Sequence, residues 1–159
     1  NSKEAAGFIA GVMNRIREIT AVLNPSASSY SRLGHFEAPR YIGWSRGNRS
    51  QLIRIPFAGE ESRNRIELRS PDSSCNQYAA LSLIIAAGIE GMEQNAKLQP
   101  EMLVNTYKAS EAELKNIESL PHSLPEALEL MKSSDFVKSV LPDVTVNALV
   151  ESSANNGSN

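Results

Sequence analysis

A short run of alternating charged and apolar residues is the feature of this chain most able to carry chemistry. In Arg65-Ile66-Glu67-Leu68-Arg69, the strand period of two places the charged side chains on one face and the apolar ones on the other. Residues two apart on a strand lie about 6.5–7 Å from each other, so the two guanidinium groups can flank the carboxylate. By itself, the pattern also fits a solvent-facing strand with an exposed ion pair.

Arginine is concentrated around this run. Residues 32–69 hold eight of the ten arginines, no lysine and four acidic residues, a formal charge of +4. Residues 70–159 carry twelve acidic residues and five lysines, a formal charge of −7. A cluster of arginine without lysine is typical of forked recognition of carboxylate or phosphate oxygens. We therefore expect residues 32–69 to bind anions.

The elements around these arginines predict a small antiparallel sheet. Residues 40–45 and 51–55 are β-rich runs on either side of Arg46-Gly47-Asn48, which predicts a hairpin, and residues 65–69 predict a third strand. A hairpin end beside the third strand would bring together four arginines: Arg49, Arg54, Arg65 and Arg69. Their positive charges would repel each other unless an anion or carboxylates lay among them. A polyphosphate with its divalent metal would satisfy them, with Glu67 as an oxygen ligand.

Helical patterns lie before and after the predicted sheet, which gives the α+β class and, for 159 residues, a single domain. Residues 3–22 predict an amphipathic helix that Asn24-Pro25 ends, and residues 26–39 predict a polar loop. Residues 76–92 predict a helix so apolar on all sides that it must be buried. A further helix is expected at 123–131, and residues 152–159 are expected to fray.

Four ordered motifs resemble the C-terminal half of the catalytic domain of bacterial-type glutamine synthetases. They are Asn24-Pro25 through Ser29-Tyr30 to Arg32-Leu33; Phe36-Glu37-Ala38-Pro39; Asn48-Arg49-Ser50 with Arg54-Ile55-Pro56; and Arg65-Ile66-Glu67-Leu68-Arg69-Ser70-Pro71-Asp72. The resemblance implies an ATP-dependent ligase that phosphorylates the γ-carboxylate of glutamate and lets ammonia displace the phosphate. It also implies Mg²⁺ or Mn²⁺ bridging the phosphates and a homo-oligomeric ring. A cytoplasmic location is expected from the residues themselves, because the first residues do not resemble a secretory signal and the lone Cys75 cannot form an internal disulfide.

The resemblance assigns roles to the arginines by position. Arg32 and Arg69 are similar to the arginines that bind the glutamate substrate and the transferring phosphoryl group. Arg49, Arg54 and Arg65 are similar to those that bind the nucleotide phosphates, and Arg49 also to one that reaches the reacting carboxylate.

Two glutamates and one tyrosine are also placed by the resemblance. Glu67 is similar to a metal ligand, and Glu37 to a glutamate on a flap that covers the substrate and takes a proton from ammonium. Tyr107 stands where some members carry a nucleotidylated tyrosine, although an ordinary packed tyrosine is the favoured interpretation. The remaining metal ligands of the family come from strands before the equivalent of Asn1, so we expect this chain to be a fragment or a shortened relative that is inactive alone.

Other functions fit parts of the same sequence pattern. A ligase joining glutamate to another amine, such as a polyamine, shares every motif above, and a non-catalytic relative would keep the fold but lose nucleotide affinity. A nucleic-acid-binding module would use the positive window, but the acidic residues after position 69 argue against it. The most apolar stretch, residues 79–89, falls short of the roughly 20 residues that a membrane-spanning helix needs.

Overall fold

The computed structural model describes residues 2–35, 37–57, 59 and 64–156. They fall into two compact units. The first unit comprises Asn1–Tyr30, Pro71–Gln99 and Pro121–Asn159, and the second comprises Ser31–Ser70 and Pro100–Leu120. Each unit is therefore assembled from segments that are distant in sequence.

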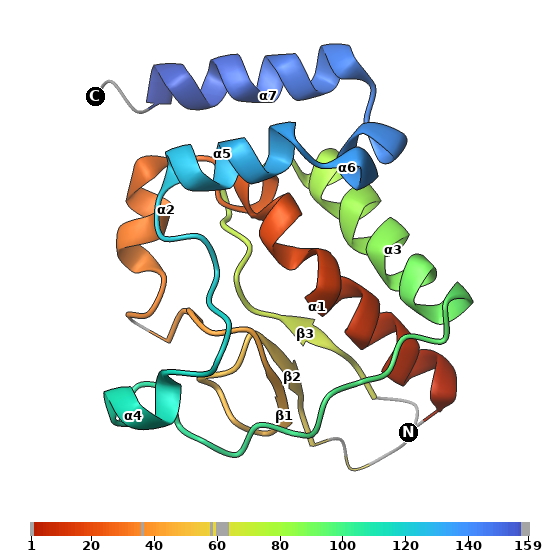
Figure 1. The fold of residues 1–159 in the computed structure, drawn as a ribbon, viewed down its shortest axis with the longest axis vertical. Helices are drawn as coiled ribbons and strands as arrows, with labels where there is room; N and C mark the ends of the chain where they lie inside the picture. The colour runs from red at the N-terminus through yellow and green to blue at the C-terminus, as the bar shows by residue number, and fades with distance from the viewer. Residues whose placement is uncertain (1, 36, 58, 60–63, 157–159) are drawn as a thin grey trace. The chain divides into compact units, whose positions relative to one another are not determined.

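The first unit is helical (Figure 1) and contains α1 (Lys3–Leu23), α3 (Gln77–Glu93), α5 (Leu124–Lys132), α6 (Asp135–Val140) and α7 (Asp143–Asn156). The predicted helices at 3–22, 76–92 and 123–131 are confirmed. Their ends follow from side-chain caps: the hydroxyls of Ser2 and Ser123 and the amide oxygen of Asn76 accept backbone N–H groups of the first turns of α1, α5 and α3.

Glycines bring α1 and α3 into close contact, and Figure 1 shows the two helices side by side. A Cβ atom added to Gly11 would lie 2.1 Å from the carbonyl oxygen of Ala87 and 2.8 Å from the Cα of Gly91. A Cβ on Gly91 would lie 2.2 Å from the carbonyl oxygen of Gly7. Only residues without side chains allow the two backbones to approach this closely.

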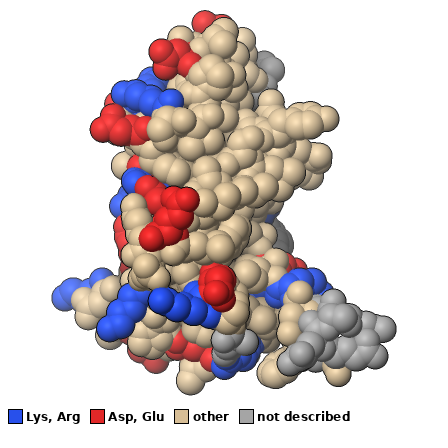
Figure 2. All heavy atoms as spheres, turned by 90° about the vertical axis from the view of Figure 1, so that its right-hand side faces the viewer, with Lys and Arg blue, Asp and Glu red and all other residues tan. Residues whose placement is uncertain are grey.

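The first unit also differs from two expectations, one for α3 and one for the C-terminal tail. One face of α3 packs on α1, but the opposite face is exposed: Tyr78, Leu81, Ile85, Ile89 and Met92. Figure 2 shows the side of the molecule that carries α3, with a broad area free of charged side chains. The prediction that this helix is buried on all sides is therefore wrong for the described residues. The tail expected to fray from residue 152 is helical through Asn156, and residues 157–159 lie outside the described part.

The loop predicted at 26–39 contains a short helix, α2 (Ala27–Arg32). Serine has a modest helix propensity, so the local sequence favoured a loop. Two hydrogen bonds to residues outside the helix stabilise it instead. The buried Tyr30 hydroxyl donates to the carbonyl oxygen of Asn24 at 2.9 Å, and the Ser29 hydroxyl donates to the Asp72 carboxylate.

The second unit holds a three-stranded sheet in the order β1 (Trp44–Arg46), β2 (Ile53–Ile55) and β3 (Glu67–Leu68), together with α4 (Glu111–Leu114). Strand β2 pairs antiparallel with β3 but parallel with β1, so the predicted hairpin and the wholly antiparallel sheet are wrong. The α+β class is confirmed.

The parallel pairing arises because residues 47–52 fold back before the next strand begins. Gly47 takes a positive φ of 80°, the Asn48 N–H donates to the Ser45 hydroxyl, and the Ser50 N–H donates to the Asn48 side-chain oxygen. These turns bring the chain back so that Ile53, the first residue of β2, lies beside Trp44, the first residue of β1. A tight two-residue turn would instead have produced the antiparallel pair.

The segment 100–120 completes the second unit through backbone hydrogen bonds to β1 and to the residues just before it. The Met102 N–H donates to the carbonyl oxygen of Trp44 at 2.9 Å, and the Leu120 N–H donates to that of Arg40 at 2.8 Å. Residues 104–107 consequently lie beside the turns at 47–52. Among the described residues, no helix combines the length and hydrophobicity that crossing a membrane would require.

Candidate active site

An ion cluster joins β2 and β3 in the second unit. Arg54 and Glu67 are cross-strand partners in the sheet register, and the Arg54 Nε lies 3.0 Å from Oε2 of Glu67. The Arg69 Nη1 lies 3.7 Å from the same oxygen. The two arginine side chains are only 15% and 13% exposed, so one partly exposed carboxylate faces two largely buried positive charges. The cluster keeps a formal excess of one positive charge, which favours an anion.

Arg69 connects this cluster to the backbone at Glu37. Its Nη2 donates to the Glu37 carbonyl oxygen at 3.0 Å. Glu37 has a φ of 65°, a left-handed conformation that costs free energy for a residue other than glycine. The hydrogen bond from Arg69 helps to hold it there. The Arg69 Nε is buried and has no hydrogen-bond partner among the described residues, so a donor is left for a further acceptor.

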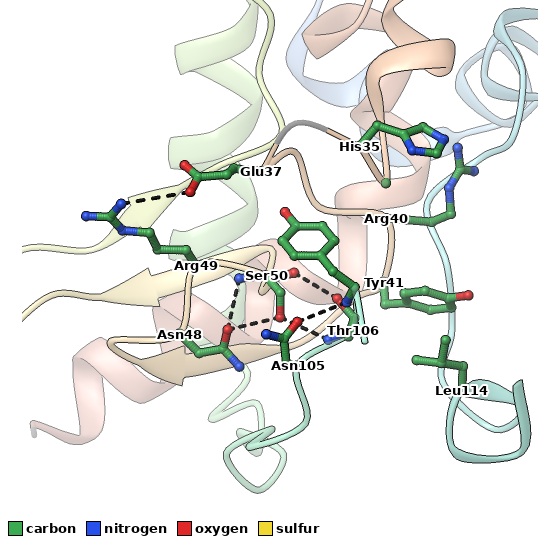
Figure 3. A pocket seen from close by; sticks show the side chains of 12 residues that line it. His35, Glu37, Arg40, Tyr41, Asn48, Arg49, Ser50, Asn105, Thr106 and Leu114 are labelled. Atoms are coloured by element: carbon green, nitrogen blue, oxygen red, sulfur yellow. Dashed lines mark hydrogen bonds and ion pairs between the residues drawn. The ribbon is translucent and has the colours of Figure 1, made fainter. Parts of the chain in front are cut away.

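A pocket of about 720 Å³ lies next to Glu37 (Figure 3). Its lining residues are Gly34, His35, Glu37, Arg40, Tyr41, Asn48, Arg49, Ser50, Asn105, Thr106, Tyr107 and Leu114. The Arg49 Nη1 lies 3.9 Å from Oε1 of Glu37, and both side chains are about two-thirds exposed. Glu37 and Arg49 thus face each other at the mouth of the pocket.

The structure separates the predicted site residues into groups. Arg54, Glu67 and Arg69 converge, and Arg69 links them to the pair of Glu37 and Arg49. Two predicted residues, Arg32 and Arg65, take no part in these ion pairs. The Arg32 Nη2 donates to the carbonyl oxygen of Ser70 at 2.9 Å, and Arg65 is exposed, with no ion pair to another described residue. Phe36 of the flap motif lies outside the described residues.

The polar residues that lie beside the turns at 47–52 were not predicted from the sequence to be part of the site. Asn48, Ser50 and Thr106 form a hydrogen-bonded network at the base of the pocket (Figure 3). The Asn48-Arg49-Ser50 motif marked the turn in the sequence, but nothing in the sequence indicated that residues 104–107 lie against it.

Tyr107 also lines the pocket and is 40% exposed. Burial raises the pKa of its phenol; nearby Arg69 lowers this pKa, and the Glu37 carboxylate raises it, with a net increase. The phenol therefore stays protonated at neutral pH and can donate a hydrogen bond to an anion in the pocket.

The described residues do not by themselves fit a divalent metal. Magnesium takes about six oxygen ligands, whereas Oε2 of Glu67 already faces two guanidinium groups. Among the residues that the structure describes, no group of three His, Cys, Asp or Glu side chains could hold an ion. The Glu67 carboxylate can supply at most two oxygen atoms, so a metal would need further carboxylates that the described residues do not offer.

The structure thus combines an α+β fold with a cluster of largely buried arginines around one carboxylate. The sequence model described as "Glutamine synthetase, catalytic domain" matches residues 1–156. The chain belongs to this family.

Curated relatives and solved structures agree with this assignment. Glutamine synthetase of Methanosarcina mazei is 47% identical over 88% of this chain and 32% of its own length, and that of Thermotoga maritima is 42% identical over 94% and 35%. A structure titled as a GmaS complex with ADP matches with a TM-score of 0.83 and 29% identity, covering 98% of this chain and 36% of its own. GmaS without ligand matches with a TM-score of 0.81 and 30% identity. This chain spans about a third of the length of these proteins.

Proposed function

We propose that the protein with this chain is a glutamate–ammonia ligase that forms γ-glutamyl phosphate from ATP and glutamate. In this proposal the chain supplies the arginine-rich half of the site. The observation that carries it is the continuous set of contacts from Arg54 through Glu67 and Arg69 to Glu37. Transfer of a phosphoryl group depends mainly on positioning and on charge stabilisation, and guanidinium groups provide both.

Each residue of this set has a proposed task. Arg54 and Arg69 would neutralise phosphate oxygens, since their side chains are largely buried and already oriented by Glu67. Arg49 would reach the phosphate or the reacting carboxylate from the mouth of the pocket. Glu37, held by Arg69, would accept a proton from ammonium so that neutral ammonia can attack.

The roles of Arg32 and Arg65 and the binding of a metal are proposed from the family resemblance. By the resemblance, Arg32 would bind glutamate and Arg65 the nucleotide phosphates. Glu67 would supply one ligand to Mg²⁺ or Mn²⁺, whose chemistry is to neutralise phosphate charge, and carboxylates elsewhere in the protein would complete the site. A cytoplasmic, homo-oligomeric ring belongs to the same proposal.

Nucleotide affinity tests the central assignment. In the full protein, Arg54→Gln and Arg69→Gln should each weaken binding of a non-hydrolysable ATP analogue with Mg²⁺ by about ten- to a hundredfold, because each removes a charge-assisted hydrogen bond. Isothermal titration calorimetry measures the change. Arg46→Gln is the matched control, since Arg46 lies 3.6 Å from Glu101 and is 42% exposed. Unchanged affinity in both test variants would contradict the proposal.

The resemblance leaves one second candidate, a ligase joining glutamate to a different amine, because such a ligase shares the same motifs. The curated relatives are more similar in sequence to this chain, which favours ammonia. Competition between ammonium and primary alkylamines during phosphate release separates the two. Preferential use of an alkylamine would establish the second candidate.

A further inference from the structure

The side chain of Arg49 makes only a weak contact with the rest of the protein. Its side chain is 64% exposed, and its ion pair with Glu37 spans 3.9 Å. Exposed pairs of this length contribute little free energy and lose long side-chain entropy when they form. The position of Arg49 must therefore be set by its backbone and by the two residues on either side of it.

Both neighbours of Arg49 are bonded to a segment more than fifty residues later. The Asn48 side-chain nitrogen donates to the carbonyl oxygen of Val104 at 3.2 Å. The Thr106 N–H donates to the Ser50 hydroxyl at 3.1 Å, and the Thr106 hydroxyl donates to the Ser50 carbonyl oxygen at 3.2 Å. Thr106 thus bonds both the side chain and the backbone of Ser50.

Two hydrogen bonds within the turn join Ser50 to Asn48. The Ser50 hydroxyl donates to the Asn48 side-chain oxygen at 3.0 Å, and the Ser50 N–H donates to the same atom at 2.9 Å. Ser50 and Thr106 are 2% and 8% exposed, so water competes little for these bonds. The network links Asn48, Ser50 and Thr106 around Arg49 while leaving the guanidinium group itself outside (Figure 3).

We propose that Thr106 is a positioning residue, whose side-chain hydroxyl fixes the turn that aims Arg49 into the pocket. This inference rests on the proposed function and deepens it, because it assigns the segment 104–107 a part in ligand binding. Loss of the hydroxyl leaves the Ser50 carbonyl oxygen without its buried donor, and the turn is then free to shift. A shift of this turn moves Arg49 relative to any anion that it binds.

A double-mutant cycle in the full protein tests the role of Thr106. Thr106→Val should weaken binding of the ATP analogue with Mg²⁺ about five- to tenfold, the effect of about one hydrogen bond. Thr106→Ser keeps the hydroxyl and should restore affinity. In an Arg49→Gln background, Thr106→Val should have no further effect, because the group that it positions is absent. Calorimetry measures each dissociation constant.

A matched control separates positioning from general stability. Thr20→Val in α1 removes another buried hydroxyl that donates to a backbone carbonyl, here that of Ile16 at 2.6 Å, and it should leave the dissociation constant unchanged. Unchanged affinity in Thr106→Val, or an equal loss with and without Arg49, would overturn the positioning role while the proposed function stands. If Arg49→Gln alone binds as tightly as wild type, the assigned role of Arg49 and this inference both fail.

Discussion

At the scale of single residues, the carboxylate of Glu67 determines whether the arginine cluster can exist without a ligand. It faces Arg54 at 3.0 Å and Arg69 at 3.7 Å, and both arginines are largely buried. Without it, two like charges would lie close together in a region of reduced dielectric constant. A bound polyanion would relieve the same repulsion, so ligand and carboxylate share one electrostatic role.

We therefore expect Glu67→Gln to lower the free energy of unfolding by about 1–2 kcal/mol, discounted because the carboxylate is 40% exposed. Urea titration followed by circular dichroism measures the loss. Glu129→Gln serves as control, since Glu129 is 78% exposed and lies 3.6 Å from Lys132. Equal, negligible losses in both variants would show that the cluster does not depend on its carboxylate.

At the scale of elements, the contact between α1 and α3 depends on backbone approach at glycine. Gly11→Ala should destabilise the chain by about 3 kcal/mol, because the new Cβ would lie 2.1 Å from the Ala87 carbonyl oxygen and the helices must separate. Helix propensity alone predicts the opposite sign, a gain of about 1 kcal/mol. Thermal unfolding distinguishes them, and Gly59→Ala, where nothing lies within 4 Å, is the control.

An ion pair also joins α1 to α3 and makes this contact sensitive to acid. The Arg15 side chain donates to both oxygens of Glu90, at 2.7 and 2.8 Å, and these hydrogen bonds hold the pKa of Glu90 below its usual value of 4.5. A lowered folded-state pKa adds stability that is present above the unfolded pKa and lost as the pH falls through the folded one.

Glu90→Gln should therefore cost about 1 kcal/mol of unfolding free energy at pH 7, and the difference from wild type should shrink as the pH falls below about 4. Urea unfolding across this pH range measures both values. Glu93→Gln, at an exposed position of the same helix, should change little. A difference that stays constant with pH would exclude the proposed linkage.

At the scale of the whole molecule, the site is richer in cations than in metal ligands. Among the described residues, no three His, Cys, Asp or Glu side chains gather around one point. We expect the 159-residue chain alone to release no phosphate from ATP, with glutamate, ammonium and Mg²⁺, above a Glu67→Ala control. A malachite-green assay measures the release, and clear turnover by the chain would contradict the expectation of an incomplete site.

The sequence by itself determined the features that neighbouring residues control. The apolar periodicities placed the helices at 3–22, 76–92 and 123–131, and ordered motifs identified the family. These signals act over one or two helical turns or along a continuous motif. Strand periodicity likewise placed Glu67 and Arg69 on a common face.

Only the tertiary structure decided which distant segments meet. The parallel pairing of β1 with β2, the helix at Ala27–Arg32 and the bonding of Thr106 to Ser50 each depend on partners that local pattern does not specify. The same holds for Arg32 and Arg65, which match the family motif yet form no ion pair with Glu67. Hydrogen bonds and packing between residues far apart in sequence select among conformations that short stretches of chain allow almost equally.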